Sequence, residues 1–336
     1  MNVHVLGFFH RYNCGDDAFI PTITDIFSDH HVEFFNIDDY KGMPVQSPDI
    51  LVLGGGDVVT PYYLPIASQT LAKKKIALGV GLGYESECKL TTNTGFDAWF
   101  LRNKSDVALV KAETNAVVEY TPDLAFALKP SGNKILHRYH NTNQPVVAVL
   151  LTDYLMPSET RPDDIFWNRT KAFLEDFGPF CKRLESEGFR VLAIPCSIDQ
   201  HADDRRIHME VRAFADSKMI CINDFLSPQD MVDLLAEVDY VICQRFHSHV
   251  FAMIAGKPIM SISFTRKVKK LLIASGASVD VDCFKNDMYI KNDLWKCFCK
   301  MMQEADAMSK GFLKFTASNR LELAKVKRKV RQLIVE

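Results

Sequence analysis

An arginine and two histidines stand close together in the segment Gln244-Arg245-Phe246-His247-Ser248-His249. The segment lies between an apolar run that ends at Cys243 and a stretch of helical spacing that begins at Ser248. A fixed cation and an imidazole that titrates near neutral pH, placed where a helix begins, can bind an anion and transfer a proton. A salt-bridged arginine and a hydrogen-bonded core histidine would give the same residues, so this segment alone leaves both interpretations open.

Three further loops in the first half of the chain contain glycine, and the first two also contain aspartate: Asn13-Cys14-Gly15-Asp16-Asp17, Gly54-Gly55-Gly56-Asp57 and Gly79-Val80-Gly81-Leu82-Gly83. Gly15 permits a tight turn, and Asp16 or Asp17 can bind a ligand or simply cap the helix that follows. The three consecutive glycines let a ligand approach the backbone closely. The third loop lacks G-x-G-x-x-G spacing and an acidic residue at the required offset, so a dinucleotide site is not indicated.

The elements that position these loops alternate between short apolar runs and helical patterns, which is typical of parallel sheets covered by helices. The predicted strands cover residues 3–9, 31–37, 50–53, 76–80, 146–151, 190–194, 239–243 and 258–263, and the clearest predicted helices cover residues 167–187, 227–238, 248–255 and 266–274. Ser227 is the predicted N-cap of a helix with Pro228 at its first position. We therefore predict an α/β protein with two Rossmann-like domains facing across a cleft, and ligand contacts in loops that follow strands.

A polar stretch from Lys129 to Gln144, flanked and interrupted by Pro130, Gly132 and Pro145, marks the predicted domain boundary. The predicted division is an N-terminal domain over residues 1–133, a linker over 134–145, a C-terminal domain with the donor site over 146–290, and C-terminal helices over 291–336. The last helix is strongly basic from Lys325 to Arg331. Such a charge run favours a solvated helix face over a surface for anionic membranes or acceptors.

Composition excludes several classes of protein. The chain has 336 residues, 47% of them hydrophobic, and a net charge of -2, so the basic excess of a nucleic-acid-binding protein is absent. The longest purely apolar run, Val146–Leu151, is too short to span a bilayer, and residues 1–10 do not have the pattern of a signal peptide. Nine cysteines at irregular spacing fit reduced thiols, which predicts a cytoplasmic location.

Taken together and in order, the loops resemble the motifs of the polysaccharide pyruvyl transferases. That family carries an N-x-GD-[DE] loop, a D-x-x-x-x-GGGD segment, a G-x-G-x-G strand end, a P-D loop and an R-x-H-x-x-x-x-A-x-x-x-x-x-P stretch followed by a lysine. The matching segments here are Asn13–Asp17, Asp49–Asp57, Gly79–Gly83, Pro122-Asp123 and Arg245–Pro258 with Lys267. The resemblance runs from residue 3 to about residue 275 and implies a GT-B-like architecture.

One segment departs from the family pattern. The family places an arginine in the strand before the P-D loop, in an x-V-R-[DE]-x-x-[ST] segment, and we align this with Leu109-Val110-Lys111-Ala112-Glu113-Thr114. Lys111 keeps the charge of that arginine but loses its planar, bidentate fork.

The resemblance implies transfer of pyruvate from phosphoenolpyruvate to a sugar diol, forming a ketal. A small donor with a phosphate and a carboxylate needs several cations and backbone N–H donors, and proton transfer needs an acid or base near neutral pH. The predicted catalytic residues are His247, Asp16 and Asp17. The predicted substrate-binding residues are Arg245, Lys111, Lys267, Asn13, Gly15, Gly55, Gly56 and Phe246. We expect no metal and no cofactor, since His247-x-His249 and Cys297-x-Cys299 lack the spacing of a zinc site.

Two other functions stay open at this point. A nucleotide-sugar glycosyltransferase of GT-B type could use the same fold, with Asp280 or Asp282 as the only candidates for contacting a ribose. A sugar-binding module without activity is the second, although the presence of both Arg245 and His247 argues against it. The expected partners are phosphoenolpyruvate and a sugar or glycan acceptor, with no nucleic acid, and self-association stays open.

Overall fold

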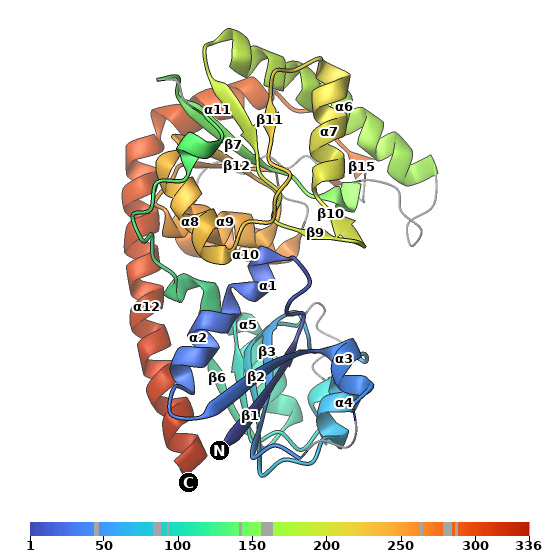
Figure 1. Ribbon diagram of the computed structural model, residues 1–336, viewed down its shortest axis with the longest axis vertical. Coiled ribbons are helices and arrows are strands. Elements are labelled where there is room, and N and C mark those ends of the chain that lie inside the picture. The colour runs from blue at the N-terminus through green and yellow to red at the C-terminus, as the bar shows by residue number, and fades with distance from the viewer. Residues whose placement is uncertain are drawn as a thin grey trace. The chain divides into compact units, whose positions relative to one another are not determined.

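The computed structural model describes residues 1–335 except 44–46, 83–88, 93, 141–142, 156–163, 263–264, 278–283 and 286–287. The chain forms two compact units, the first made of Met1–Leu128 with Ala317–Glu336 and the second of Lys129–Thr316. Each unit is built on a parallel sheet (Figure 1). Within the described residues, no helix is both long and apolar enough to cross a membrane.

The first unit contains a six-stranded parallel sheet in the order β2-β1-β3-β4-β5-β6. Its strands are β1 (Asn2–Gly7), β2 (His31–Asn36), β3 (Ile50–Gly56), β4 (Lys74–Val80), β5 (Ala98–Leu101) and β6 (Val117–Tyr120). Its helices are α1 (Cys14–Asp17), α2 (Phe19–Ile26), α3 (Ile37–Lys41), α4 (Leu64–Gln69) and α5 (Lys104–Glu113), with a 3-10 turn over Leu124–Ala127. The order in which successive strands are added to the sheet reverses between β1 and β3. Doubly wound sheets bind ligands at this position.

Both faces of this sheet are covered. On one face, residues of α3, α4 and α5 pack with alternate strand residues such as Leu53, Trp99 and Leu101 into one apolar core. On the other face, Ile23 of α2 lies with Val5 and Val52 around Gly54. Figure 1 shows α2 on the opposite side of the sheet from α3 and α4. Because side chains alternate along a strand, this double coverage explains why every residue of β1 and β3 except Asn2 is buried.

The second unit contains a five-stranded parallel sheet in the order β11-β8-β7-β12-β13. Its strands are β7 (Val146–Leu150), β8 (Arg190–Ala193), β11 (Ile220–Cys221), β12 (Tyr240–Cys243) and β13 (Ile259–Ser261), beside the two short antiparallel pairs β9–β10 (Ile198–Asp199, Ala202–Asp203) and β14–β15 (Phe284–Lys285, Met288–Tyr289). Its helices are α6 (Asp164–Ser186), α7 (Arg205–Ala215), α8 (Pro228–Glu237), α9 (Phe246–Ile254), α10 (Arg266–Ser275), α11 (Leu294–Gln303) and the first part of α12 (Ala305–Val335). Here the reversal falls between β7 and β12.

The prediction of two Rossmann-like domains is confirmed by these two parallel sheets. Ser227 caps α8 as predicted, accepting the backbone N–H of Asp230 at 3.1 Å.

The domain boundaries differ from the prediction at two places. The predicted linker over residues 134–145 belongs to the second unit, because Glu237 of α8 accepts the backbone N–H groups of Ile135 and Leu136. The C-terminal helices do not form a separate region: α12 begins in the second unit, and its residues from Ala317 belong to the first.

Candidate active site

The carboxyl ends of β7, β8 and β12 bring three loops of the second unit together. They are the segment after β7 (Leu151–Tyr154), the hairpin β9–β10 that leads into α7, and the segment Gln244–His247 after β12. Gln244 joins two of them, because its Oε1 accepts the backbone N–H of Thr152 at 2.8 Å. This edge of the sheet lies at the reversal of strand order, so the geometry is that of a ligand site in a doubly wound fold.

Arg245 is fixed in this edge by Asp204. Its Nε donates to Oδ1 and Oδ2 of Asp204 at 2.9 and 2.8 Å, and its Nη2 donates to Oδ1 at 2.7 Å. Asp204 is fully buried and also accepts the backbone N–H groups of Cys196, Ser197 and Asp153 at 3.0–3.1 Å. One carboxylate therefore ties the guanidinium to all three loops.

Burial acts against both charges of this pair, and the pairing offsets it. Burial alone would lower the pKa of Arg245, but the Asp204 carboxylate outweighs that effect and raises the pKa above its usual value. Burial raises the pKa of Asp204, while the Arg245 charge and the backbone donors favour its ionised form. With five donors on two oxygens, we treat Asp204 as a carboxylate near neutral pH.

The pairing leaves part of Arg245 for a ligand. Its Nε and Nη2 edge is salt-bridged, which is the structural role that the sequence left open. In the described part of the chain, Nη1 has no hydrogen-bond partner, and the side chain keeps 12% exposure. The guanidinium also lies 5.0 Å from the ring of Tyr154. The exposed edge can therefore bind an anion while the other edge holds the loops.

Phe246, His247 and Lys267 lie close to Arg245. Arg245 is the N-cap residue of α9, and Phe246 and His247 are in its first turn. His247 is partly exposed as a residue but its Nε2 is buried, and its ring contacts Phe246 edge-on at 5.3 Å between ring centroids. The ammonium of Lys267, on α10, lies 5.8 Å from the Phe246 ring. The structure thus brings these four predicted site residues to one edge, beside the positive end of α9.

His249 has a different environment from His247. It is fully buried, with Nδ1 2.6 Å from the carbonyl oxygen of Arg245 and Nε2 2.9 Å from Oγ of Ser261. Burial lowers its pKa to about 4, so the ring is neutral near pH 7. In that state Nδ1–H donates to Arg245 and Nε2 accepts the Ser261 hydroxyl, which fixes the start of α9 to β13.

The first unit places the predicted N-x-G-D-D loop after β1, at its own reversal of strand order. Asn13 caps α1 by accepting the backbone N–H of Gly15 at 3.1 Å. Asp17 accepts the backbone N–H of His10 at 2.9 Å. Burial raises the pKa of Asp17, and the hydrogen bond from His10 opposes that rise. The capping side chain in this loop is therefore Asn13, and not Asp16 or Asp17 as the sequence suggested.

The glycine-rich segment that ends β3 packs against the same helices. Gly55 and Gly56 have φ values of +70° and +82°, which favour glycine. A Cβ on Gly55 would overlap the ring of Phe19, and a Cβ on Gly56 would lie 3.3 Å from Oδ1 of Asp16. These two glycines are thus required by the backbone and by close packing, and Asp16 is brought beside Gly56.

Arg102, at the end of β5, is a residue that the sequence analysis missed. Its guanidinium forms ion pairs with Asp57 of the glycine-rich loop and with Asp123 of the P-D loop, the latter at 3.2 Å. Asp57 and Asp123 outweigh the effect of burial and raise the pKa of Arg102. A Cβ on Gly81 would lie 2.7 Å from Nε of Arg102 and 2.8 Å from Oδ1 of Asp57. Three of the motif segments in the first unit therefore meet around one buried arginine.

Arg102 also corrects the alignment that involved Lys111. The segment Leu109–Thr114 is not a strand, because residues up to Glu113 belong to helix α5. The segment Leu101-Arg102-Asn103-Lys104-Ser105-Asp106 instead has its arginine directly after strand β5, with Asp106 four positions later where the family pattern has serine or threonine. From its position at a strand end, we assign the family's arginine to Arg102 instead of Lys111.

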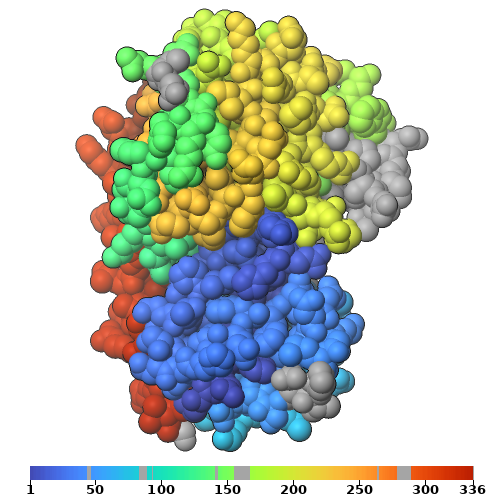
Figure 2. All heavy atoms as spheres, in the orientation of Figure 1, coloured from blue at the N-terminus to red at the C-terminus, as the bar shows by residue number. Residues whose placement is uncertain are grey.

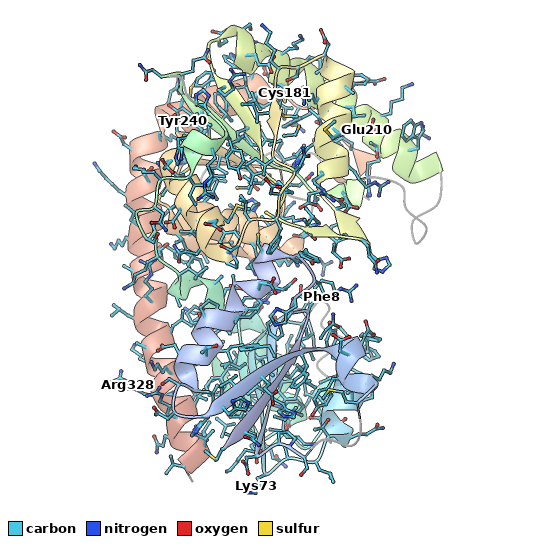
Figure 3. All side chains as sticks on the ribbon, in the orientation of Figure 1. Phe8, Lys73, Cys181, Glu210, Tyr240 and Arg328 are labelled. Atoms are coloured by element: carbon cyan, nitrogen blue, oxygen red, sulfur yellow. The ribbon has the colours of Figure 1, made fainter. Side chains whose placement is uncertain are left out.

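The structure does not bring Lys111 to the loops at the carboxyl ends of the strands. Lys111 is exposed near the end of α5 and lines a cavity of about 440 Å³ with Phe96 and Asn115, which precede β5 and β6. These residues belong to the amino edge of the sheet. In Figure 3, Phe8 marks the carboxyl edge of this sheet and Lys73 the amino edge. The predicted role of Lys111 in donor binding has no support from its position.

The remaining predictions concern the ribose-contacting aspartates, the end of the G-x-G-x-G loop, and metal binding. Asp280, Asp282 and Gly83 lie outside the described residues. Across the described part of the chain, no group of three or more His, Cys, Asp or Glu side chains is placed to hold a metal ion.

A comparison with known protein families covers most of the chain. The family model of the polysaccharide pyruvyl transferases matches residues 13–266, about three quarters of the chain. The chain belongs to the polysaccharide pyruvyl transferase family. No curated protein matches it.

Solved structures share the fold at low sequence identity. UDP-GlcNAc 2-epimerase from Neisseria meningitidis has a TM-score of 0.61 and 11% identity, with 100% of each chain covered. A putative UDP-N-acetylglucosamine 2-epimerase from Listeria monocytogenes has a TM-score of 0.59 and 12% identity, covering 97% of this chain and 94% of the other. These structures confirm the predicted GT-B-like fold.

Proposed function

We propose that this protein is a pyruvyl transferase that moves pyruvate from phosphoenolpyruvate onto a sugar diol and forms a ketal in glycan or polysaccharide biosynthesis. The observation that carries the proposal is the Arg245–His247 segment, which lies within the family match and presents a cation, an imidazole and a helix amino end at one sheet edge. Phosphoenolpyruvate has a phosphate and a carboxylate on one small molecule, and such a ligand needs this set of donors.

The chemistry needs proton transfer at two places. The methylene carbon of phosphoenolpyruvate gains a proton, two sugar hydroxyls lose theirs as two C–O bonds form at C2, and the C2–O bond to phosphate breaks. The net products are the sugar ketal and inorganic phosphate, with no redox change. His247 is partly exposed beside Arg245, so we propose it as the general acid or base.

Other residues are proposed to bind the substrates. Arg245 contacts the donor through the guanidinium edge that Asp204 leaves exposed, and Lys267 adds a second positive charge near Phe246. Asp16 and Asp17, with the loop glycines beside them, remain the candidates for contact with acceptor hydroxyls. The reaction as proposed needs no metal, since side-chain cations can neutralise the donor.

Phosphate release from phosphoenolpyruvate, measured across a panel of methyl galactosides, mannosides and amino sugars, tests the function. We expect release with at least one sugar, a new ketal methyl signal in the proton NMR spectrum of the product, and unchanged turnover after EDTA treatment. A His247→Gln variant controls for contaminating phosphatase. Release of UDP from a UDP-sugar, without phosphate release from phosphoenolpyruvate, would instead establish the glycosyltransferase alternative.

A further inference from the structure

Two arginines begin helix α7 at the carboxyl edge of the second sheet, and they have different surroundings. Arg205 is held by Asp203, with Nε 2.9 Å from Oδ1 and Nη2 2.6 Å from Oδ2, and its Nη1 donates to the carbonyl oxygen of Asn223 at 3.1 Å. Arg206 instead has Nη1 3.6 Å from Oδ2 of Asp153, in the loop that follows β7. Adjacent in the chain, the two guanidinium groups therefore contact different loops.

Asp153 brings Arg206 and Arg245 to the same place. Its carboxylate is almost fully buried, and its other oxygen, Oδ1, lies 3.9 Å from Nη2 of Arg245. Both separations exceed hydrogen-bond length, so Asp153 holds the two guanidinium groups together mainly by charge. Arg206 keeps 45% of its side chain exposed, compared with 12% for Arg245. The result is a pair of arginines beside one carboxylate, of which Arg206 is the more exposed.

Arg206 lies in the first turn of α7, close to the carboxylates of Asp153 and of the N-cap residue Asp204. The amino end of an eleven-residue helix carries partial positive charge, which disfavours cations there. The first turn of α7 contains no acidic residue. A second cation kept beside Arg245 in such a place is expected where the site binds a ligand with more than one negative group.

We propose that Arg206 is a further donor-binding residue, and that Arg206 and Arg245 form a two-arginine clamp on the two anionic groups of the donor. The inference rests on the proposed function. Arg245 and the amino end of α9 take the phosphate, and the planar fork of Arg206 takes the carboxylate. Asp153 and Asp204 are positioning residues that set the spacing of the two guanidinium groups.

Calorimetric titration with phosphoenolpyruvate tests this clamp on the full-length chain. Arg206→Gln should weaken binding roughly ten- to a hundredfold, as for the loss of charge-assisted hydrogen bonds, and Arg206→Lys should give a smaller loss. Arg205→Gln is the matched control and should stay within about threefold of wild type, since that guanidinium is turned to Asp203 and Asn223. Inorganic phosphate, which lacks the carboxylate, should bind Arg206→Gln and wild type nearly equally. Melting temperatures show whether each variant is folded.

Several outcomes would overturn the clamp. They are wild-type affinity in Arg206→Gln, an equal loss in Arg205→Gln, or a loss of phosphate affinity as large as that for phosphoenolpyruvate. If the wild-type protein binds UDP but not phosphoenolpyruvate, the proposed function fails separately. The same variants titrated with UDP then decide whether Arg206 contacts a donor, and a wild type that binds neither ligand overturns both proposals.

Discussion

The Arg245–Asp204 pair shows why single substitutions at this site must be read with a stability measurement. Removing one partner of a buried ion pair leaves the other charge without compensation, at a typical cost of about 3–5 kcal/mol. Asp204 is fully buried and holds three backbone N–H groups besides the guanidinium. Loss of activity on replacing either residue would therefore combine a binding effect with a folding effect. The two histidines nearby separate these effects better.

His247→Gln and His249→Gln should have opposite consequences. Loss of a positioned general acid or base at His247 should lower kcat by roughly 10²–10⁴-fold. Since His247 is partly exposed, the change in melting temperature should be smaller than for the fully buried His249. His249→Gln removes buried contacts to Arg245 and Ser261 and should destabilise the fold by about 1–3 kcal/mol, with kcat per folded molecule changed far less. Measuring kcat and melting temperature side by side distinguishes the roles, and a fall in both melting temperatures with neither kcat affected would contradict them.

His249 should also make stability depend on pH. Its folded-state pKa of about 4 lies below the ordinary value of 6.5, so between these pH values the unfolded chain binds a proton that the folded chain excludes. Stability contributed by the neutral ring is thus complete above about pH 6.5 and is lost as the pH falls toward 4. Urea unfolding of wild type and His249→Gln from pH 4 to 7 should give a wild-type slope steeper by about 1.4 kcal/mol per pH unit in this window. Equal slopes would mean that His249 is not buried neutral.

At the scale of elements, Gly81 leaves room for the ion pairs of Arg102 with Asp57 and Asp123, around which β3, β4 and β5 end. We predict that Gly81→Ala destabilises the first unit by about 1–3 kcal/mol, because its Cβ would meet Arg102 and Asp57 at under 3 Å. Gly311→Ala is a control of opposite sign. Gly311 lies in α12 with no heavy atom within 4 Å of its added Cβ, so alanine there should stabilise by about 0.5–1 kcal/mol. Chemical denaturation of both variants checks this, and a neutral Gly81→Ala would show that the cluster yields without cost.

The elements that the sequence predicts well are those with strong local signals. Long apolar runs predict β3 and β7, and Ser227 with Pro228 predicts the start of α8. The four-residue strands β5 and β6 were missed because each is short and neighbours the weakly amphipathic α5. The family arginine follows a strand end, so with β5 missed it was aligned with Lys111 instead of Arg102. The strand-end position of Arg102, directly after Phe100-Leu101, is the signal that could have identified it.

The site residues also divide into those with a local sequence signal and those without one. Arg245 and His247 could be predicted because a motif places them at a strand-to-helix loop. Asp153, Asp204 and Arg206 could not, since each acquires its role from partners 41 to 92 positions away in the chain, and none stands in a local pattern. Long-range pairing of charges becomes visible only when the sheet brings the loop ends together.

At the scale of the whole molecule, the basic end of the chain is part of the first unit. Lys327 forms an ion pair with Asp25 at 2.7 Å, and Lys329 forms one with Glu119. Arg331 donates to the carbonyl oxygens of Ile26 and Asp25 and to Oγ of Ser28. Figure 2 shows the end of α12 lying directly against residues near the N-terminus. The predicted solvated helix face is therefore only half correct, because these cations join α12 to α2 and β6.

This arrangement predicts that the basic end stabilises the fold instead of binding anionic surfaces. Arg331→Ala should lower the free energy of unfolding by about 1–2 kcal/mol, because it removes donors from two backbone carbonyls. Arg328, labelled in Figure 3, is exposed on the same helix, so Arg328→Ala should change stability by less than about 0.5 kcal/mol. Urea unfolding measures both, while sedimentation with phosphatidylserine vesicles tests the alternative role. If vesicle binding falls equally in the two variants and stability changes in neither, the basic residues act as a membrane-binding surface and the anchoring role is wrong.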